Sequence, residues 1–232
     1  KQWYQRRVHG GTANIATKMG FPLTTTSAAS YAYVPTILKH IECRIGALSA
    51  LPSLLDKLNI RTPLIVTGNS LATKTDVISQ ISAVIEGSGR KVAGVHSKIG
   101  EHAPIAGIHS GVELLKKYAS EGDVGLIAVG GGSPIDASKT MIHLYEKEFG
   151  KTLKMISIPT TLSAAELTIM SGYTNEDKVK TGVKGSAYTS SAIIYDANLA
   201  LSTPNKLWIS TGVRALDHAA EQQIRPNAPL PV

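Results

Sequence analysis

One stretch of the chain combines the residue types that bind anions, three consecutive glycines and a serine: Gly130, Gly131, Gly132 and Ser133. It directly follows an apolar run at 124–129, which is typical of a buried parallel strand. Glycines allow a sharp turn because no Cβ stands in the way. A glycine turn of this kind, between a strand and a helix, is a place where a phosphate can bind.

The residues after the glycines predict that a helix begins there. Ser133 is a suitable N-cap, Pro134 suits the first helical position, and Asp136 lies three residues after the cap, as in a capping box. Free N–H groups and the positive end of the helix dipole would then face the phosphate. An ordinary βα turn with nothing bound is the alternative, since the string is neither G-x-G-x-x-G nor a P-loop.

Periodicity places the glycine turn within an alternation of strands and helices. Apolar runs predict strands at 63–67, 91–95, 124–129, 155–158 and 192–195. Helical spacing predicts helices at 48–58, 74–88, 105–119 and 133–149, and a last one after Thr203-Pro204. Glycines between 164 and 195 indicate a hairpin. The alternation predicts an α/β fold, with a parallel sheet covered by helices on both faces.

Candidate binding residues follow three of the predicted strands. They are Gly68, the turn at 130–133, and the pair Thr160 and Thr161. Ligands of open parallel sheets bind at the carboxyl ends of the strands, so we expect these residues to share one edge.

The composition limits the classes of protein to consider. The 232 residues suit one large domain or somewhat more, and 43% are hydrophobic, which is enough for a full core. No apolar run approaches the roughly 18–20 residues that span a bilayer, so we expect no membrane partner. A single cysteine, Cys43, excludes an internal disulfide framework.

The net charge of +7 is concentrated at the start of the chain. Residues 1–41 carry five Lys or Arg and no acid, which leaves the other residues nearly neutral and without a basic stripe. We therefore expect no nucleic-acid partner. We interpret residues 1–40 as a basic surface arm of a cytoplasmic protein. A mitochondrial transit peptide is the alternative.

Three strings, in order and spacing, resemble the iron-containing alcohol dehydrogenases, and within them the maleylacetate reductase-like branch. They run over 130–139, 158–166 and 212–221, and the likeness extends from about 45 to 228. The resemblance implies a Rossmann-like dinucleotide-binding domain at 41–203. It also implies that 204–232 begins an all-helical domain that is otherwise absent from this chain.

The resemblance implies an NAD(P)-dependent oxidoreductase that moves hydride between the nicotinamide and a small alcohol or carbonyl substrate. By analogy, the pyrophosphate and nearby sugar would be held by the glycine turn from Gly130 to Ser133 and by Asp136. Thr160 and Thr161 would line the nucleotide site, and Lys184 would reach the nicotinamide. Without the resemblance, the Thr pair would pass for a turn cap and Lys184 for a solvated loop lysine.

The end of the first strand of this domain bears on the choice of cofactor. NAD-selective members tend to place an acid there, which would repel a 2′-phosphate. This chain instead has Gly68, Asn69 and Ser70, with Lys74 a turn further on. Glycine gives room, and the amide and hydroxyl can donate to phosphate oxygens. We therefore expect NADP to be accepted, with NAD as the alternative.

The metal site of the family is incomplete in this sequence. The resemblance implies one Asp and three His as ligands, with the Asp four residues before the first His on a helix. His218 matches that His, but the Asp position is Arg214, which has no lone pair to offer. We therefore expect no tightly bound iron or zinc. We take Arg214, His218 and Lys184 as candidate catalytic residues. Arg214 would pair with a substrate carboxylate or with a neighbouring acid.

Two functions stay open from the sequence. One is the oxidoreductase, acting on a small-molecule substrate. The other is an isolated NAD(P)-binding domain without turnover of its own. A lyase of the dehydroquinate synthase type is a third, less favoured function. We also expect a homo-oligomer, because the segment near Trp208 to Leu216 would expose apolar surface.

Overall fold

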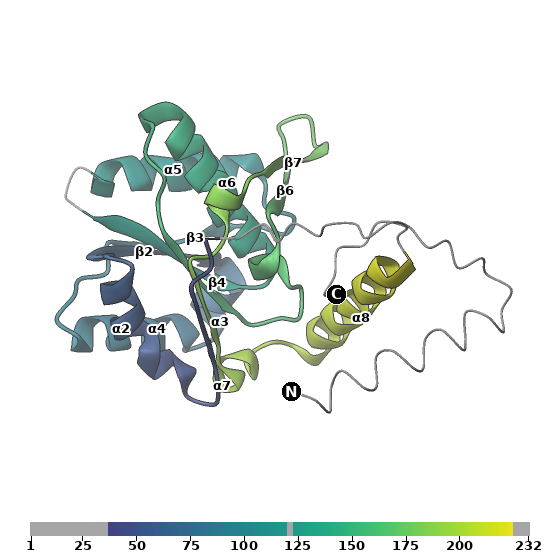
Figure 1. Cartoon of the computed structure of the whole chain (residues 1–232), viewed down its shortest axis with the longest axis horizontal. Helices are drawn as coiled ribbons and strands as arrows, with labels where there is room; N and C mark the ends of the chain where they lie inside the picture. The colour runs from purple at the N-terminus through teal and green to yellow at the C-terminus, as the bar shows by residue number, and fades with distance from the viewer. Residues whose placement is uncertain (1–36, 120–122, 225–232) are drawn as a thin grey trace, which may run out of the picture. The chain divides into compact units, whose positions relative to one another are not determined.

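The computed structural model describes residues 37–119 and 123–224 (Figure 1). Residues 1–36 of the predicted arm at 1–40 therefore lie outside the described residues. Six strands form one parallel sheet in the order β1-β8-β5-β4-β2-β3. Their bounds are β1 His40–Cys43, β2 Thr62–Gly68, β3 Gly94–Ile99, β4 Val124–Gly130, β5 Met155–Pro159 and β8 Ala192–Tyr195. The predicted α/β class with a parallel sheet is confirmed.

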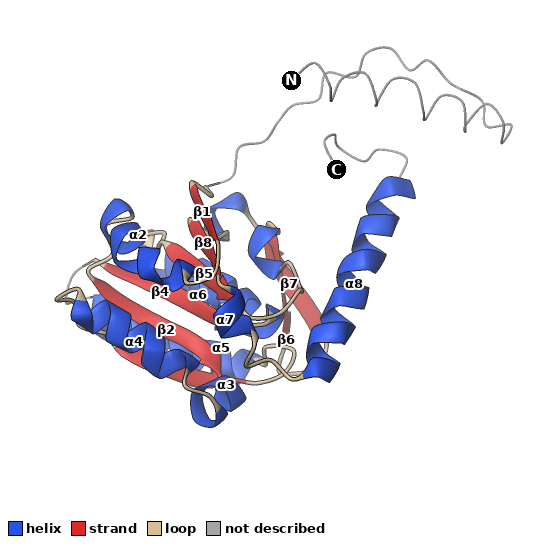
Figure 2. Cartoon of the chain, turned by 90° about the horizontal axis from the view of Figure 1, so that it is seen from below, coloured by secondary structure: helices blue, strands red, loops and turns tan. Residues whose placement is uncertain are grey.

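Helices pack on both faces of this sheet (Figure 2). Alternate residues of a strand point to opposite faces. On β2, Ile65 packs with one core cluster, whereas Leu64 and Val66 pack with the other. The first cluster includes η1 Ala47–Ala50, α2 Leu51–Lys57 and α4 Val77–Gly87. The second includes α5 Ile105–Ala119 and α6 Gly132–Phe149.

The strand order reverses at β2, between β3 and β4. From β2 the chain runs outward to β3, and then returns to the other side of β2 to form β4. Ligands bind at such a reversal, outside the carboxyl ends of the strands. Val66 lies opposite Ala128, and Gly130 lies opposite Pro159, so β2, β4 and β5 end at the same edge.

A two-stranded antiparallel hairpin lies beside α6 (Figure 1). It consists of β6 Met170–Thr174 and β7 Lys180–Lys184, between the short helices η2 Ala165–Leu167 and η3 Ser186–Tyr188. The predicted hairpin is thus confirmed. After β8 come α7 Ala197–Ala200 and α8 Asn205–Ile224.

Sequence reasoning misplaced three boundaries. The edge strand β1 was not predicted, and it begins at His40, within the segment interpreted as an arm. β3 begins at Gly94 and not at Lys91. The helix predicted at 74–88 is α4, which begins only at Val77 because Thr75 is extended, and the short helix before it, α3 Asn69–Lys74, was not predicted.

The last helix exposes much of its apolar surface. On α8, Ile209, Val213 and Leu216 are each more than 60% exposed. None of the helices within 37–119 and 123–224 has both the length and the apolar character needed to cross a membrane.

Two helical glycines give a matched test of the packing. A Cβ on Gly107 would lie 2.6 Å from the backbone oxygen of Lys98, whereas a Cβ on Gly87 would meet open space. We expect Gly107→Ala to lower the free energy of unfolding by about 1–3 kcal/mol. Gly87→Ala should leave it unchanged or raise it by up to about 1 kcal/mol. Urea denaturation checks both, and equal effects would contradict this packing of α5.

Candidate functional site

The glycine turn joins β4 to α6 at the carboxyl ends of the strands. Gly130 has φ +131°, a conformation that side chains rarely adopt, so a glycine is required there. α6 begins at Gly132, with Gly131 as N-cap and no side chain capping it. The first turn of an 18-residue helix therefore presents its N–H groups without a side-chain acceptor.

The predicted capping box is wrong, because its two side chains have partners elsewhere. Ser133 lies inside the helix, and its Oγ accepts a hydrogen bond from the backbone N–H of His102 at 3.2 Å. Oδ2 of Asp136 accepts from the N–H of Gly172 on β6 at 3.3 Å. Pro134 is consequently the third helical residue rather than the first.

Asp136 joins α6 to the hairpin and carries an unusual pKa. Burial raises the pKa of its carboxyl, and the charges of Lys139, Lys180 and Arg214 oppose that rise, as does the Gly172 hydrogen bond. The sequence predicted that Asp136 holds the pyrophosphate or sugar, and this role stays a prediction.

The segment after β5 packs directly on the glycine turn. The N–H of Thr160 donates to the carbonyl of Gly130 at 2.9 Å. A Cβ on Gly131 would lie 3.2 Å from the Thr161 side chain, and one on Gly132 would lie 3.4 Å from Ser163 Oγ. The hydroxyls of Thr161 and Ser163 are buried and have no hydrogen-bond partner within the described residues. Ser163 was not among the predicted site residues.

The end of β2 lies next to this turn. Gly68 ends β2, and the exposed Asn69 and Ser70 open α3. The side chain of Leu71, in the same first turn, comes within 3.8 Å of a Cβ position on Gly130. The structure thus brings together three of the predicted segments, 68–70, 130–133 and 160–161.

The three candidate catalytic residues lie on other elements. Lys184 is exposed at the end of β7. Arg214 and His218 lie one turn apart on α8, where Arg214 Nε donates to His218 Nε2 at 3.3 Å. His218 Nδ1 is 3.6 Å from a carboxylate oxygen of Glu221. Within the described residues, no three His, Cys, Asp or Glu side chains are grouped closely enough to hold a metal. Metal content stays a prediction.

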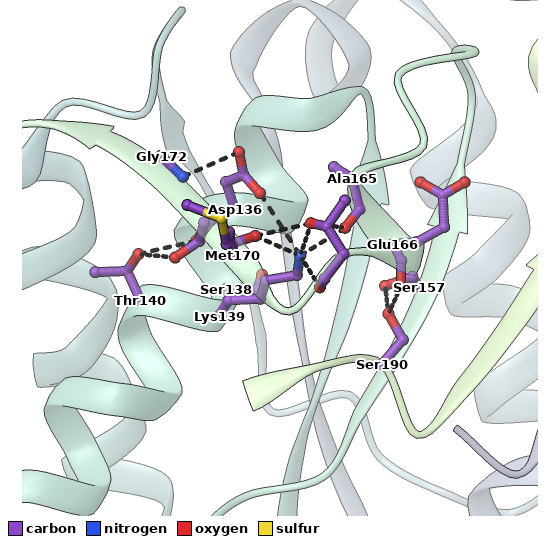
Figure 3. Close-up of polar contacts among 12 residues, drawn as sticks. Asp136, Ser138, Lys139, Thr140, Ser157, Ala165, Glu166, Met170, Gly172 and Ser190 are labelled. Atoms are coloured by element: carbon purple, nitrogen blue, oxygen red, sulfur yellow. Dashed lines mark hydrogen bonds and ion pairs between the residues drawn. The ribbon is translucent and has the colours of Figure 1, made fainter. Parts of the chain in front are cut away.

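Lys139 on α6 is a functional candidate that sequence reasoning missed (Figure 3). Its side chain is 1% exposed, and Nζ lies within hydrogen-bond distance of four oxygens. Burial lowers the pKa of this amine to about 8, and Asp136 and Glu166 oppose that change. The sequence could have indicated that Lys139 is buried, because it lies on the same helical face as Ile135 and Ile142, which pack in the core.

Glu166, which follows Ala165 in the chain, forms a buried carboxyl-phenol pair with Tyr195 of β8. Glu166 is 4% exposed, and its Oε1 accepts a hydrogen bond from the Tyr195 hydroxyl at 2.9 Å. Its backbone oxygen accepts from Ser190 Oγ, which also contacts Ser157 Oγ (Figure 3). Burial and the nearby Glu166 raise the pKa of Tyr195 well above its usual value. The pair borders a cavity of about 580 Å³ between β1, β5, β8 and α8.

The strand order and the glycine turn define an α/β protein of the doubly wound class. Residues 39–197 match the family described as "Iron-containing alcohol dehydrogenase". The chain belongs to this family, and the resemblance expected from the three strings is confirmed.

Individual relatives agree with this assignment. The chain is 28% identical to a maleylacetate reductase of Pseudomonas sp. (strain P51) over 182 residues, which are 78% of this chain and 47% of that enzyme. The crystal structure of maleylacetate reductase from Rhizobium sp. strain MTP-10005 has 24% identity and a TM-score of 0.72, over 88% of this chain and 53% of that one.

A sulfoacetaldehyde reductase from Bifidobacterium kashiwanohense in complex with NAD+ is also similar in fold. It has 21% identity and a TM-score of 0.73, over 84% of this chain and 53% of that one. The chain thus spans about half the length of the relatives it matches.

The carboxyl-phenol pair gives a test of this region. Tyr195→Phe removes the hydrogen-bond partner of Glu166, so we expect the free energy of unfolding to fall by about 1–3 kcal/mol at pH 7. Tyr173→Phe is the control, because that hydroxyl makes no hydrogen bond within the described residues and its loss should change the value by less than about 0.5 kcal/mol. Chemical denaturation measures both, and equal effects would exclude the Tyr195–Glu166 bond as a contributor.

Proposed function

We propose that this chain binds NAD(P) at the carboxyl edge of β2, β4 and β5, as part of an oxidoreductase of the iron-containing alcohol dehydrogenase type. One observation carries the proposal. The uncapped start of α6 at Gly132 lies beside the buried hydroxyls of Thr161 and Ser163, which lack a partner within the described residues. Buried donors of this kind are satisfied when an anion is bound.

The residues at this edge fit a dinucleotide. The N–H groups of the first turn of α6 would donate to the pyrophosphate, and the helix dipole would favour its charge. Thr160 and Thr161 would line the nucleotide beyond it. The end of β2 would face the adenosine ribose, because it lies at the same reversal of strand order.

We further propose that NADP is preferred over NAD. Gly68 at the end of β2 has no carboxylate to repel a 2′-phosphate. Asn69 and Ser70 are exposed there and can donate hydrogen bonds, and Lys74 ends the same short helix. NAD is the second candidate, and it is the cofactor in the complex of the sulfoacetaldehyde reductase.

The cofactor, when bound, would exchange a hydride with an alcohol or carbonyl carbon. Lys184 on β7 and the pair Arg214 and His218 on α8 would supply polar groups for the substrate side. Arg214 would bind a substrate carboxylate, since a guanidinium pairs with carboxylates through two parallel hydrogen bonds. Several relatives are maleylacetate reductases, and their substrate name favours such an acidic substrate.

A second candidate function is an NAD(P)-binding domain without turnover of its own. It is favoured by the exposure of apolar side chains on α8, where the proposed substrate residues lie. The exposed side chains Ile209, Val213 and Leu216 also support our proposal that the chain self-associates.

Nucleotide titration tests the proposed site. We expect saturable binding of NADP to the purified chain by calorimetry. Gly131→Val should weaken it at least tenfold, because a Cβ at Gly131 meets Thr161 at 3.2 Å and the larger side chain would displace the turn. Gly87→Ala, far from this edge, is the control and should bind as the unaltered chain does. No binding of either nucleotide would refute the proposal. NAD binding at least tenfold tighter than NADP would refute the cofactor preference.

A substitution on α8 tests the proposed role of Arg214. With NADP present, we expect the chain to bind maleate, a dicarboxylate probe, and Arg214→Ala to weaken that binding about tenfold or more through loss of a charged hydrogen-bonding partner. Lys206→Ala removes a charge from the same exposed helix and should have little effect. If both substitutions change the maleate Kd equally, Arg214 makes only a general electrostatic contribution.

A further inference from the structure

The Lys139 ammonium is surrounded by oxygens from a single stretch of chain (Figure 3). Nζ lies 2.5 Å from the carbonyl oxygen of Ala165, 2.8 Å from that of Thr168 and 2.9 Å from that of Met170. The Thr168 hydroxyl is the fourth oxygen, at 2.9 Å. Lys139 therefore holds the backbone of residues 165–170 against α6.

The other end of the same stretch lies on the glycine turn. Thr161 and Ser163 contact the positions where Gly131 and Gly132 lack a Cβ, and the Cβ of Ala165 is 3.8 Å from that position on Gly132. Residues 161–170, which we call the clamp segment, are thus attached to α6 at its first turn and again two turns later. Between the two contacts, Ala164 has φ +55°. Such a backbone conformation persists when surrounding contacts fix it.

The arrangement of four oxygens around Lys139 Nζ requires the charged form of the amine. An ammonium has three protons to donate among four oxygens, whereas a neutral amine has two protons and no charge. The acidic groups that act on Nζ are Asp136 on α6, at 3.8 Å, and Glu166 on η2. Lys180 on β7 and Arg214 on α8 act on Asp136 in turn.

We propose that Lys139 is a positioning residue for the nucleotide site: its ammonium fixes the clamp segment, and thereby keeps Thr161 and Ser163 against the glycine turn. This inference rests on the proposed nucleotide binding. Among the described residues, the contacts of Lys139 Nζ are with residues 165–170 and Asp136, and none of them is with the glycine turn. Its effect on affinity passes through the clamp segment.

The affinity for the nucleotide should therefore depend on pH. The direction of the change is set by the burial of Lys139, which lowers the pKa of its amine. Because burial lowers the pKa of Lys139 to about 8, the amine is charged at pH 7 and mostly neutral at pH 9. The clamp segment loses its charged anchor across this range. Affinity for the nucleotide should therefore fall as the pH rises from 7 to 9.

The test compares Lys139→Met with Lys116→Met, which removes a lysine on α5 that is ion-paired with Glu113 and with Glu148 near the end of α6. NADP binding is measured by calorimetry between pH 7 and 9. We expect Kd to rise at least fivefold over this range for the unaltered chain and for Lys116→Met. For Lys139→Met we expect Kd to be at least tenfold higher at pH 7 and nearly constant with pH. A Lys139→Met protein that keeps the affinity or the pH profile of the unaltered chain would overturn the inference.

Two further readouts separate this inference from the proposed function. The unaltered chain alone is informative, because an affinity that is constant from pH 7 to 9 overturns the inference even if Lys139→Met does not fold. If neither nucleotide binds, the proposed function fails, and hydrogen exchange of the amides at 165–170 tests whether Lys139 holds the clamp segment. Faster exchange in Lys139→Gln than in Lys116→Met supports the clamp, and equal exchange overturns it.

Discussion

The close contact between the glycine turn and residues 161–163 is the constraint on which the candidate site depends. A Cβ on Gly131 would lie 3.2 Å from the Thr161 side chain, which is tighter than most Cβ contacts, and one on Gly132 would already be in van der Waals contact with Ser163 Oγ at 3.4 Å. The N–H of Thr160 also donates to Gly130. The glycines therefore have two uses. They let the chain turn from β4 into α6, and they let the segment after β5 approach the start of that helix.

Much of the sheet could be predicted because its central strands are buried on both faces. β4 and β5 are buried at every residue, so they are continuous apolar runs in the sequence. β1 gave no such signal. It is an edge strand of four residues in which half-buried and exposed residues alternate, and only its pairing with β8, far along the chain, makes it a strand.

The site could be predicted as a set of segments but not as a set of contacts. Strand ends share an edge by topology, which is why 68–70, 130–133 and 160–161 could be grouped from the sequence. The partner of a polar side chain depends instead on distant residues. Ser133 and Asp136 fit a capping box locally, yet the backbone of His102 and of Gly172 binds them. Lys139 bonds to residues 26 to 31 positions away, which no local pattern reveals.

The proposed nucleotide binding and the proposed turnover would depend on different parts of this chain. The proposed nucleotide edge is formed by β4 and β5, which are buried at every residue, and by α6, whose core-facing residues are buried. The proposed substrate residues lie on α8, where Arg214 and His218 are exposed beside apolar side chains that nothing described covers. Hydride transfer is favoured by orientation and by exclusion of water, which can together lower a barrier by several kcal/mol. On this proposal, turnover would require a covering surface for α8, whereas nucleotide binding would require only that the clamp segment stays on α6.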